Sequence, residues 1–182
     1  SLLLTQASLA LDAAEIEKVR RKDVLANKDL TVIDNFVAEG IKELLQAEDF
    51  TSLARIRTDI LARQSSEQES AQAQYRGRFF EAAQKHISKG LEEAKNIKEP
   101  QRRFVVLTNL LMLIDGFESL AFVDIATEYL KSENGVVRYW AIHSVTNSGI
   151  IEKVNNSGVK EIRVAKKIIT ELSKLAENSS PE

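Results

Sequence analysis

The chain has 182 residues, with 25 Lys and Arg against 27 Asp and Glu and a formal net charge of −2. A chain of this length buries about 70% of the surface that its unfolded form exposes, so it can fold without a metal or a disulfide. The absence of cysteine excludes disulfides, thiolate nucleophiles and the usual structural zinc sites. Because nucleic-acid binding depends chiefly on neutralising phosphates, the balanced charge argues against it without excluding a basic stripe on one face.

No stretch of the sequence approaches the roughly 20 consecutive apolar residues of a membrane-spanning helix, so we expect no membrane span. Residues 2–10, LLLTQASLA, resemble the end of a signal peptide but lack its basic beginning. We therefore favour a first helical turn or an arm at residues 1–11. A cysteine-free chain suits either redox environment, so a cytoplasmic location is favoured while an extracytoplasmic one stays open.

Few helix breakers interrupt the sequence, which has two prolines and seven glycines. Apolar residues recur at helical spacing in nearly every window, which predicts an all-helical chain. Asp12 can cap a helix that runs to about Asn27, and Asp29 can cap a second helix. One apolar stripe of the second helix consists of Ile33, Phe36, Val37, Ile41, Leu44 and Leu45.

An acidic break at Glu48 and Asp49 leads into a third helix, over residues 50–61. The polar run at residues 64–70 follows, either as a loop or as a continuation of the helix.

A long helix is expected over residues 75–97, before Pro100, because proline favours the first turn of the helix that follows. Gly77 and Gly90 fall inside this span. Each glycine costs about 1 kcal/mol relative to alanine in a helix, which indicates a close helix contact or a break at those points.

Residues 104–114, FVVLTNLLMLI, are apolar on almost every side and predict the central buried helix, ending at Asp115 and Gly116. The last long helix, over residues 159–175, carries its apolar residues on one face. Residues 178–182 are expected to form a flexible tail.

A helical hairpin is expected between these two helices. It consists of a helix over residues 117–131, a polar turn at residues 132–135 and a helix over residues 136–147. Asn134 can cap the second helix, whose inward face would carry small and branched apolar residues.

The hairpin at residues 117–148 resembles a HEAT-type repeat, in which the linker is followed by Val-Arg and, three positions after the arginine, a small residue. Val137, Arg138 and Ala141 have this arrangement. The resemblance implies stacked antiparallel helical hairpins, an α-solenoid, and a surface that binds partners rather than catalyses.

The hairpin departs from the family because Ser132 or Asn134 replaces the usual linker aspartate, which puts an arginine ladder along the stack in doubt. We expect one all-helical HEAT-like domain over residues 1–182, with an irregular helical bundle as the alternative.

Catalytic and metal-binding patterns are not found in the sequence. His86 and His143 are the only histidines, and neither has further ligands at metal spacing. The sequence has no glycine-rich phosphate loop and no G-x-S-x-G elbow. We therefore expect a protein that is not an enzyme and that has no cofactor and no metal.

Three basic clusters lie at residues 20–22, at residues 76 and 78, and at residues 102 and 103. They are either solvated helix faces paired with acids or a groove in which Tyr75, Tyr139 and Trp140 add anchoring groups. We predict a scaffold that binds a protein or peptide, with nucleic acid as the alternative partner; the oligomeric state stays open. The candidate binding residues are Arg102, Arg103, Arg138, Tyr139 and His143.

Overall fold

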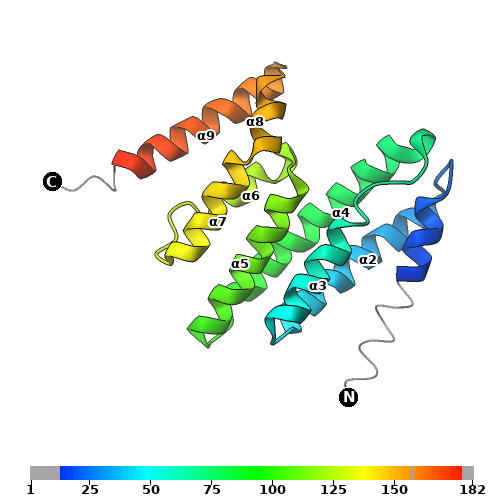
Figure 1. The fold of residues 1–182 in the computed structure, drawn as a ribbon, viewed down its shortest axis with the longest axis horizontal. Helices are drawn as coiled ribbons and strands as arrows, with labels where there is room; N and C mark the ends of the chain where they lie inside the picture. The colour runs from blue at the N-terminus through cyan, green and yellow to red at the C-terminus, as the bar shows by residue number, and fades with distance from the viewer. Residues whose placement is uncertain (1–12, 157, 178–182) are drawn as a thin grey trace. The chain divides into compact units, whose positions relative to one another are not determined.

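A computed structural model describes residues 13–156 and 158–177, all placed in helices and the turns between them (Figure 1). The prediction of an all-α fold is confirmed, and the described residues form no strand. Within the same residues no helix is both long enough and apolar enough to span a bilayer. The arm predicted at residues 1–11 and the tail predicted at residues 178–182 lie outside the part that is described.

The chain divides into two compact units, Ser1–Lys95 and Asn96–Glu182. Each has its own buried apolar residues, so each is described separately as unit 1 and unit 2. The single domain over residues 1–182 and its HEAT-like stacking stay predictions.

The described part of unit 1, residues 13–95, consists of helical residues 13–20 followed by three helices. These are α2 at Asn27–Gln46, α3 at Phe50–Leu61 and α4 at Glu69–Lys95. Helix α2 packs against both α3 and α4. The predicted stripe of α2 forms its buried face, except for Leu45. The acidic break is also confirmed, because Asp49 caps α3 by accepting a hydrogen bond of 2.8 Å from the Ser52 backbone N–H.

Aromatic side chains fill the centre of unit 1. The Phe36 and Phe79 rings lie 6.4 Å apart, and Tyr75 stacks on Phe79 at 6.0 Å. Tyr75 is fully buried, so it is not the exposed anchoring group considered from the sequence. Its hydroxyl donates to the Arg63 carbonyl at 2.9 Å, and burial raises its pKa.

The beginning of α2 differs from the prediction. Asp29 is not the N-cap; Ala26 is, and the Asp29 carboxylate accepts the Ala26 backbone N–H at 2.9 Å from the third helical position. Lys22 donates to the same carboxylate at 2.6 Å. The predicted first helix is too long, because helical residues stop at Arg20 and the chain turns before Asn27.

Helix α4 passes through both of its glycines without a break. A Cβ added at Gly77 would meet nothing within 4 Å, so the expected close contact is absent there. Gly90 is buried. The close approach in unit 1 occurs instead at Gly40, where a Cβ would lie 2.9 Å from the Ile60 side chain of α3.

Unit 2 begins with α5 at Pro100–Phe117, with proline in the first turn as predicted. Its middle, from Val106 to Leu111, is buried on all sides. The short helix η1 at Leu120–Phe122 and α6 at Val123–Thr127 follow, and then α7 at Gly135–Thr146, α8 at Ser148–Asn155 and α9 at Val159–Glu177. Helix α7 packs against α5 and α6, while α9 packs against α8 and α6.

The long helix predicted over residues 117–131 is wrong. Glu118 has a left-handed backbone, φ 47°, and ends α5. After Thr127 the chain continues in tight i to i+3 bonds, such as those from Tyr129 N–H to the Ala126 carbonyl and from Ser132 N–H to the Tyr129 carbonyl. These turns replace the remaining α-helical turns of the expected hairpin arm.

The second arm of the hairpin is confirmed as α7. The Asn134 side chain accepts the backbone N–H groups of Val136 and Val137 at 3.0 and 3.1 Å. Val137, Ala141 and Val145 form the buried face of the helix. The next helix, α8, was not predicted, and it begins with a second asparagine cap, in which Asn147 accepts the Ile150 N–H at 3.0 Å.

Candidate functional site

Exposed apolar side chains gather in unit 2. Among the described residues, eight large hydrophobic side chains are exposed, and six of them belong to unit 2. Two lie on α7, namely Val136 and Tyr139. The others lie on α8 and α9, namely Ile151, Val159, Ile162 and Ile169. Large apolar groups that stay in water are common at surfaces that bind partners, so unit 2 is the place to look for a site.

Three rings cluster on the outer surface of α7. Tyr139 meets Trp140 edge to face at a centroid distance of 5.4 Å. His143 lies 5.9 Å from Tyr139 and 5.4 Å from Trp140. Tyr139 is 56% exposed, whereas the other two rings are half-buried. The cluster presents aromatic surface to solvent on a regular helix, and we call it the α7 face.

Asp115, near the C-terminal end of α5, contacts this cluster through His143. Its Oδ1 lies 2.8 Å from His143 Nδ1 and accepts a hydrogen bond of 2.7 Å from Asn147 Nδ2. The Asp115 backbone carbonyl also accepts from Asn147, at 3.3 Å. One carboxylate therefore connects α5 to the aromatic face of α7 and to the cap of α8.

The contact with Asp115 determines which nitrogen of the neutral His143 ring carries the proton. A carboxylate only accepts hydrogen bonds, so the neutral imidazole carries its proton on Nδ1. Nε2 is then the acceptor, and it becomes a second donor when the ring is protonated. Among the described residues nothing hydrogen-bonds to Nε2, so a partner can use it.

The three arginines predicted for the site are not part of this face. Arg138 donates through Nη1 to the Ser132 carbonyl at 2.6 Å, which fixes the turn before α7. Arg103 lies over the Phe104 ring at 5.4 Å and reaches the Ile97 carbonyl at 3.4 Å. Arg102 lies beside it in the first turn of α5.

Helix geometry shows why Arg102 and Arg103 lie away from the α7 face. Two hydrogen bonds show that α5 and α7 run parallel. Ser144 bonds to Leu111, and Asn147, three residues later, bonds to Asp115, which is also later in the chain than Leu111. Arg103 lies about 18 Å before Asp115 along the axis, whereas Tyr139 lies only about 6 Å before His143. The structure thus brings Tyr139 and His143 together and leaves Arg102 and Arg103 towards the other end of α5.

A groove that the sequence did not reveal lies between the end of α7, α8 and α9. It has a volume of about 130 Å³ and an almost entirely apolar lining. We call it the α8–α9 groove, and it is lined by Val145, Thr146, Ile150, Ile151, Val154, Asn155, Ala165, Ile168 and Ile169. The amphipathic pattern of α9 placed its apolar residues on one face, yet Ile168 is the only buried one among the side chains of that helix that the structure describes.

The groove adjoins the α7 face. Tyr139, His143 and Thr146 stand at i, i+4 and i+7 on α7, so they share one side of the helix. Thr146 lines the groove. An elongated partner lying along this side of α7 would meet the rings first and the apolar groove next.

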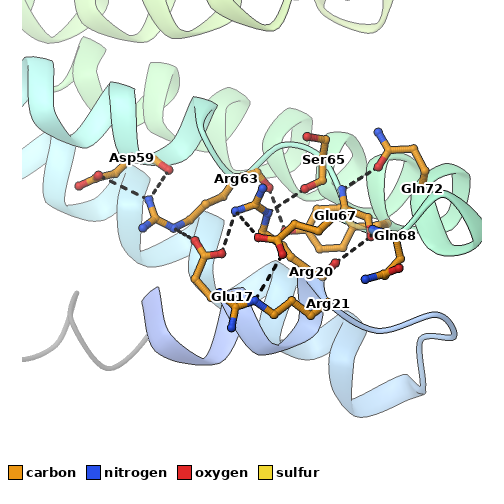
Figure 2. Close-up of polar contacts among 11 residues, drawn as sticks. Glu17, Arg20, Arg21, Asp59, Arg63, Ser65, Glu67, Gln68 and Gln72 are labelled. Carbon is orange, nitrogen blue, oxygen red and sulfur yellow. Dashed lines mark hydrogen bonds and ion pairs between the residues drawn. The ribbon is translucent and has the colours of Figure 1, made fainter.

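Unit 1 holds a dense polar cluster that joins helical residues 13–20 to the loop after α3 (Figure 2). Glu17 pairs with Arg20 at 2.8 Å and with Arg63 at 2.9 Å. Arg20 Nε also donates to the Ser65 carbonyl at 2.8 Å, and Glu67 pairs with Arg21 at 3.3 Å. The cluster fixes the loop. Asp59 also pairs with Arg63, at 3.5 Å, so three carboxylates balance the three arginines.

The first basic cluster from the sequence is therefore paired with acids. Arg20 and Arg21 contact Glu17 and Glu67. Lys22 contacts Asp29. In the second cluster, Arg78 pairs with Glu81 at 3.1 Å and Arg76 lies over the Phe80 ring at 5.1 Å. The structure favours the interpretation of these residues as solvated or paired helix faces.

The other histidine, His86, also has an acidic neighbour. Its Nε2 lies 3.3 Å from Asp34, which pairs with Lys85 at 3.2 Å as well. Burial would raise the pKa of Asp34, but the hydrogen bond from Lys85 and the nearby His86 ring outweigh it and the pKa is lowered. In the part of the chain that is described, no three His, Asp or Glu side chains are grouped so as to hold a metal ion.

Comparison of the chain with family models, with curated proteins and with solved structures found no significant match.

Proposed function

We propose that the protein is a non-enzymatic scaffold that binds a protein or peptide partner through the α7 face of unit 2. The observation that carries the proposal is the exposed ring cluster of Tyr139, Trp140 and His143, held by Asp115. Tyrosine and tryptophan are over-represented among the residues that dominate binding energy. They contribute a large contact area while losing few rotamers.

The cluster is pre-organised, which supports the proposal. Trp140 and His143 are half-buried, and the imidazole is tethered by the 2.8 Å contact with Asp115. Side chains that are already ordered lose less conformational entropy when a partner docks. Nε2 of His143, to which no described residue hydrogen-bonds, adds a polar group that can fix the register of a partner backbone.

We propose a smaller set of binding residues than the sequence suggested. Tyr139 and His143 remain, and Trp140 joins them. Arg138 acts indirectly, because its guanidinium supports the turn at Ser132 rather than facing a partner. Arg102 and Arg103 would take part only with a partner long enough to follow α5 towards its N-terminal end.

The test is an unbiased selection of displayed peptides against the whole chain. We expect enriched sequences whose binding falls at least tenfold with Tyr139→Ala and with His143→Ala. The matched control is Phe50→Ala, which removes an aromatic ring that is 76% exposed on unit 1. Circular dichroism would establish that all three variants keep their helix content.

The proposal fails if the enriched peptides bind wild type, Tyr139→Ala and His143→Ala with equal affinity. It also fails if Phe50→Ala weakens binding as much as Tyr139→Ala does, because the contact would then not belong to the α7 face.

A further inference from the structure

We propose that the α7 face is a pH-sensitive binding surface, which takes up a proton at His143 when it binds an uncharged segment of a partner. This inference rests on the proposed function, because it adds a regulation to the same surface. Two observations carry it: the 2.8 Å contact between His143 and Asp115, and the difference in exposure between the two side chains.

The pair of Asp115 and His143 changes its net charge with pH. A carboxylate is negative over the range from about pH 5 to 8, in which histidine titrates. The pair therefore carries a net negative charge while the ring is neutral and no net charge once the ring is protonated. Asn147 donates a hydrogen bond of 2.7 Å to the same carboxylate, but it adds no charge.

Among the described residues, His143 is the only ionisable side chain that pairs with Asp115. Helix α7 packs against α5, α6 and α8. The other ionisable residues of α5, Arg102 and Arg103, lie about 18 Å or more before Asp115 along the axis. Arg138 of α7 itself donates to a carbonyl in the preceding turn. None of these arginines neutralises Asp115.

The ionisable residues of α6 and α8 also make other contacts or face solvent. Asp124 of α6 pairs with Lys167 of α9. In α8, Lys153 donates to the Glu118 carbonyl at 2.6 Å and Glu152 is exposed. The Glu118 carboxylate lies against the first turn of α8. The charge of Asp115 is therefore balanced only when His143 is protonated.

Docking of a partner makes this charge matter. The side chain of Asp115 is 17% exposed and that of His143 is 44% exposed, so a partner that covers the ring removes water from both. Removing water from a net charge costs more free energy than removing it from a neutral, hydrogen-bonded pair. An uncharged segment should therefore bind more tightly to the face with a protonated ring.

Protonation also gives the face a new hydrogen-bond donor. Nδ1 of His143 remains on Asp115, while Nε2 changes from an acceptor to a donor. A backbone carbonyl of the partner can accept from Nε2, and a hydrogen bond from a charged donor is about twice as strong as a neutral one. Both effects predict that binding strengthens as the pH falls.

The test measures the dissociation constant of an enriched displayed peptide at about pH 8 and at about pH 5.5, which bracket the titration of histidine. The peptide is one without ionisable side chains and with both ends blocked, so that it does not titrate itself. We expect wild type to bind it at least threefold more tightly at the lower pH.

Two substitutions separate the effect of charge from that of structure. His143→Gln keeps the site negative at both pH values, so its affinity should not change with pH. Asp115→Asn leaves the protonated ring without a carboxylate, so its affinity should fall at the lower pH. This reversal is not expected if Asp115 only holds the ring in place.

The matched control is His86→Gln, because His86 is the other histidine of the chain and belongs to unit 1. This variant should keep the pH dependence of wild type. Circular dichroism at both pH values verifies that all of the variants stay folded.

The outcomes separate this inference from the proposed function. A peptide that Tyr139→Ala weakens, but that binds wild type equally or more weakly at the lower pH, refutes the inference and leaves the proposed function in place. A wild-type pH dependence that persists in Asp115→Asn, or that disappears in His86→Gln, also refutes the inference. If neither Tyr139→Ala nor the pH changes the binding of any enriched peptide, both proposals fail.

Discussion

Asn147 connects three parts of unit 2, so its replacement gives a graded prediction. Its side-chain oxygen caps α8 through the Ile150 N–H at 3.0 Å, and its amide donates to the Asp115 carboxylate at 2.7 Å. Asn147→Ser keeps a capping oxygen but removes the amide donor. Asn147→Ala removes both interactions.

The magnitudes follow from the two contacts. Loss of an N-cap costs about 1 kcal/mol. A hydrogen bond to a charged group contributes about 1.5 to 3 kcal/mol when buried, and we take about 1 kcal/mol because Asn147 is half-buried. We therefore expect unit 2 to lose about 1 kcal/mol in Asn147→Ser and about 2 kcal/mol in Asn147→Ala.

Urea unfolding followed by tryptophan fluorescence measures these changes. Trp140 is the single tryptophan of the chain and belongs to unit 2, so its emission reports on that unit alone. Asn156→Ala at the other end of α8 is the control, and it should change the free energy of unfolding by less than about 0.5 kcal/mol because Asn156 is exposed. Equal losses in Asn147→Ser and Asn147→Ala would refute the capping role. A loss below about 0.5 kcal/mol in Asn147→Ala would refute both contacts.

Three further predictions concern single backbone and charge features. Gly77→Ala should stabilise unit 1 by about 1 kcal/mol in urea unfolding followed by circular dichroism, because the added Cβ meets nothing within 4 Å. No gain there would show that α4 is not a regular helix at this point. Glu118→Gly should stabilise unit 2 by about 1 kcal/mol, because glycine adopts the φ of 47° without strain, whereas Glu118→Ala should give no gain. Urea unfolding followed by Trp140 fluorescence measures both variants. Equal changes in the free energy of unfolding would contradict the left-handed cap. Burial would raise the pKa of Asp29, but the hydrogen bonds from Lys22 and Ala26 lower it below the ordinary value of 3.8. The stability that the ionised Asp29 contributes is present above pH 3.8 and is lost as the pH falls through the lowered pKa. The urea midpoint of wild type should therefore fall more steeply in acid than that of Asp29→Asn. The same dependence of the midpoint on pH in both proteins would contradict this.

Local signals predicted the parts of the fold that depend on neighbouring residues. Pro100 in the first turn of α5, Asp49 before α3 and Asn134 before α7 all act at the helix beginnings where the sequence placed them. Asp29 shows the limit of such signals. The same carboxylate can serve at the N-cap or at the third helical position, and only the path of residues 21–26 decides between them.

The failure at residues 117–131 has a related cause. Apolar spacing there suits a helix, but it does not reveal whether successive turns bond at i+4 or at i+3. After Thr127 the chain takes the tighter turns, as the bond from Leu130 N–H to the Thr127 carbonyl shows.

The candidate site was predictable only in part. Helical spacing places Tyr139 and His143 one turn apart, so their proximity follows from the sequence. The contact between His143 and Asp115 depends on the parallel packing of α5 and α7, which no local pattern specifies. The α8–α9 groove was missed because the apolar stripe of α9 indicates a face that avoids water but does not show what covers it.

Partner binding through the α7 face is measured most directly by the dissociation constant of the most enriched displayed peptide for wild type, Tyr139→Ala and Phe50→Ala. We expect at least tenfold weaker binding for Tyr139→Ala and an unchanged dissociation constant for Phe50→Ala. Equal constants for wild type and Tyr139→Ala would contradict it.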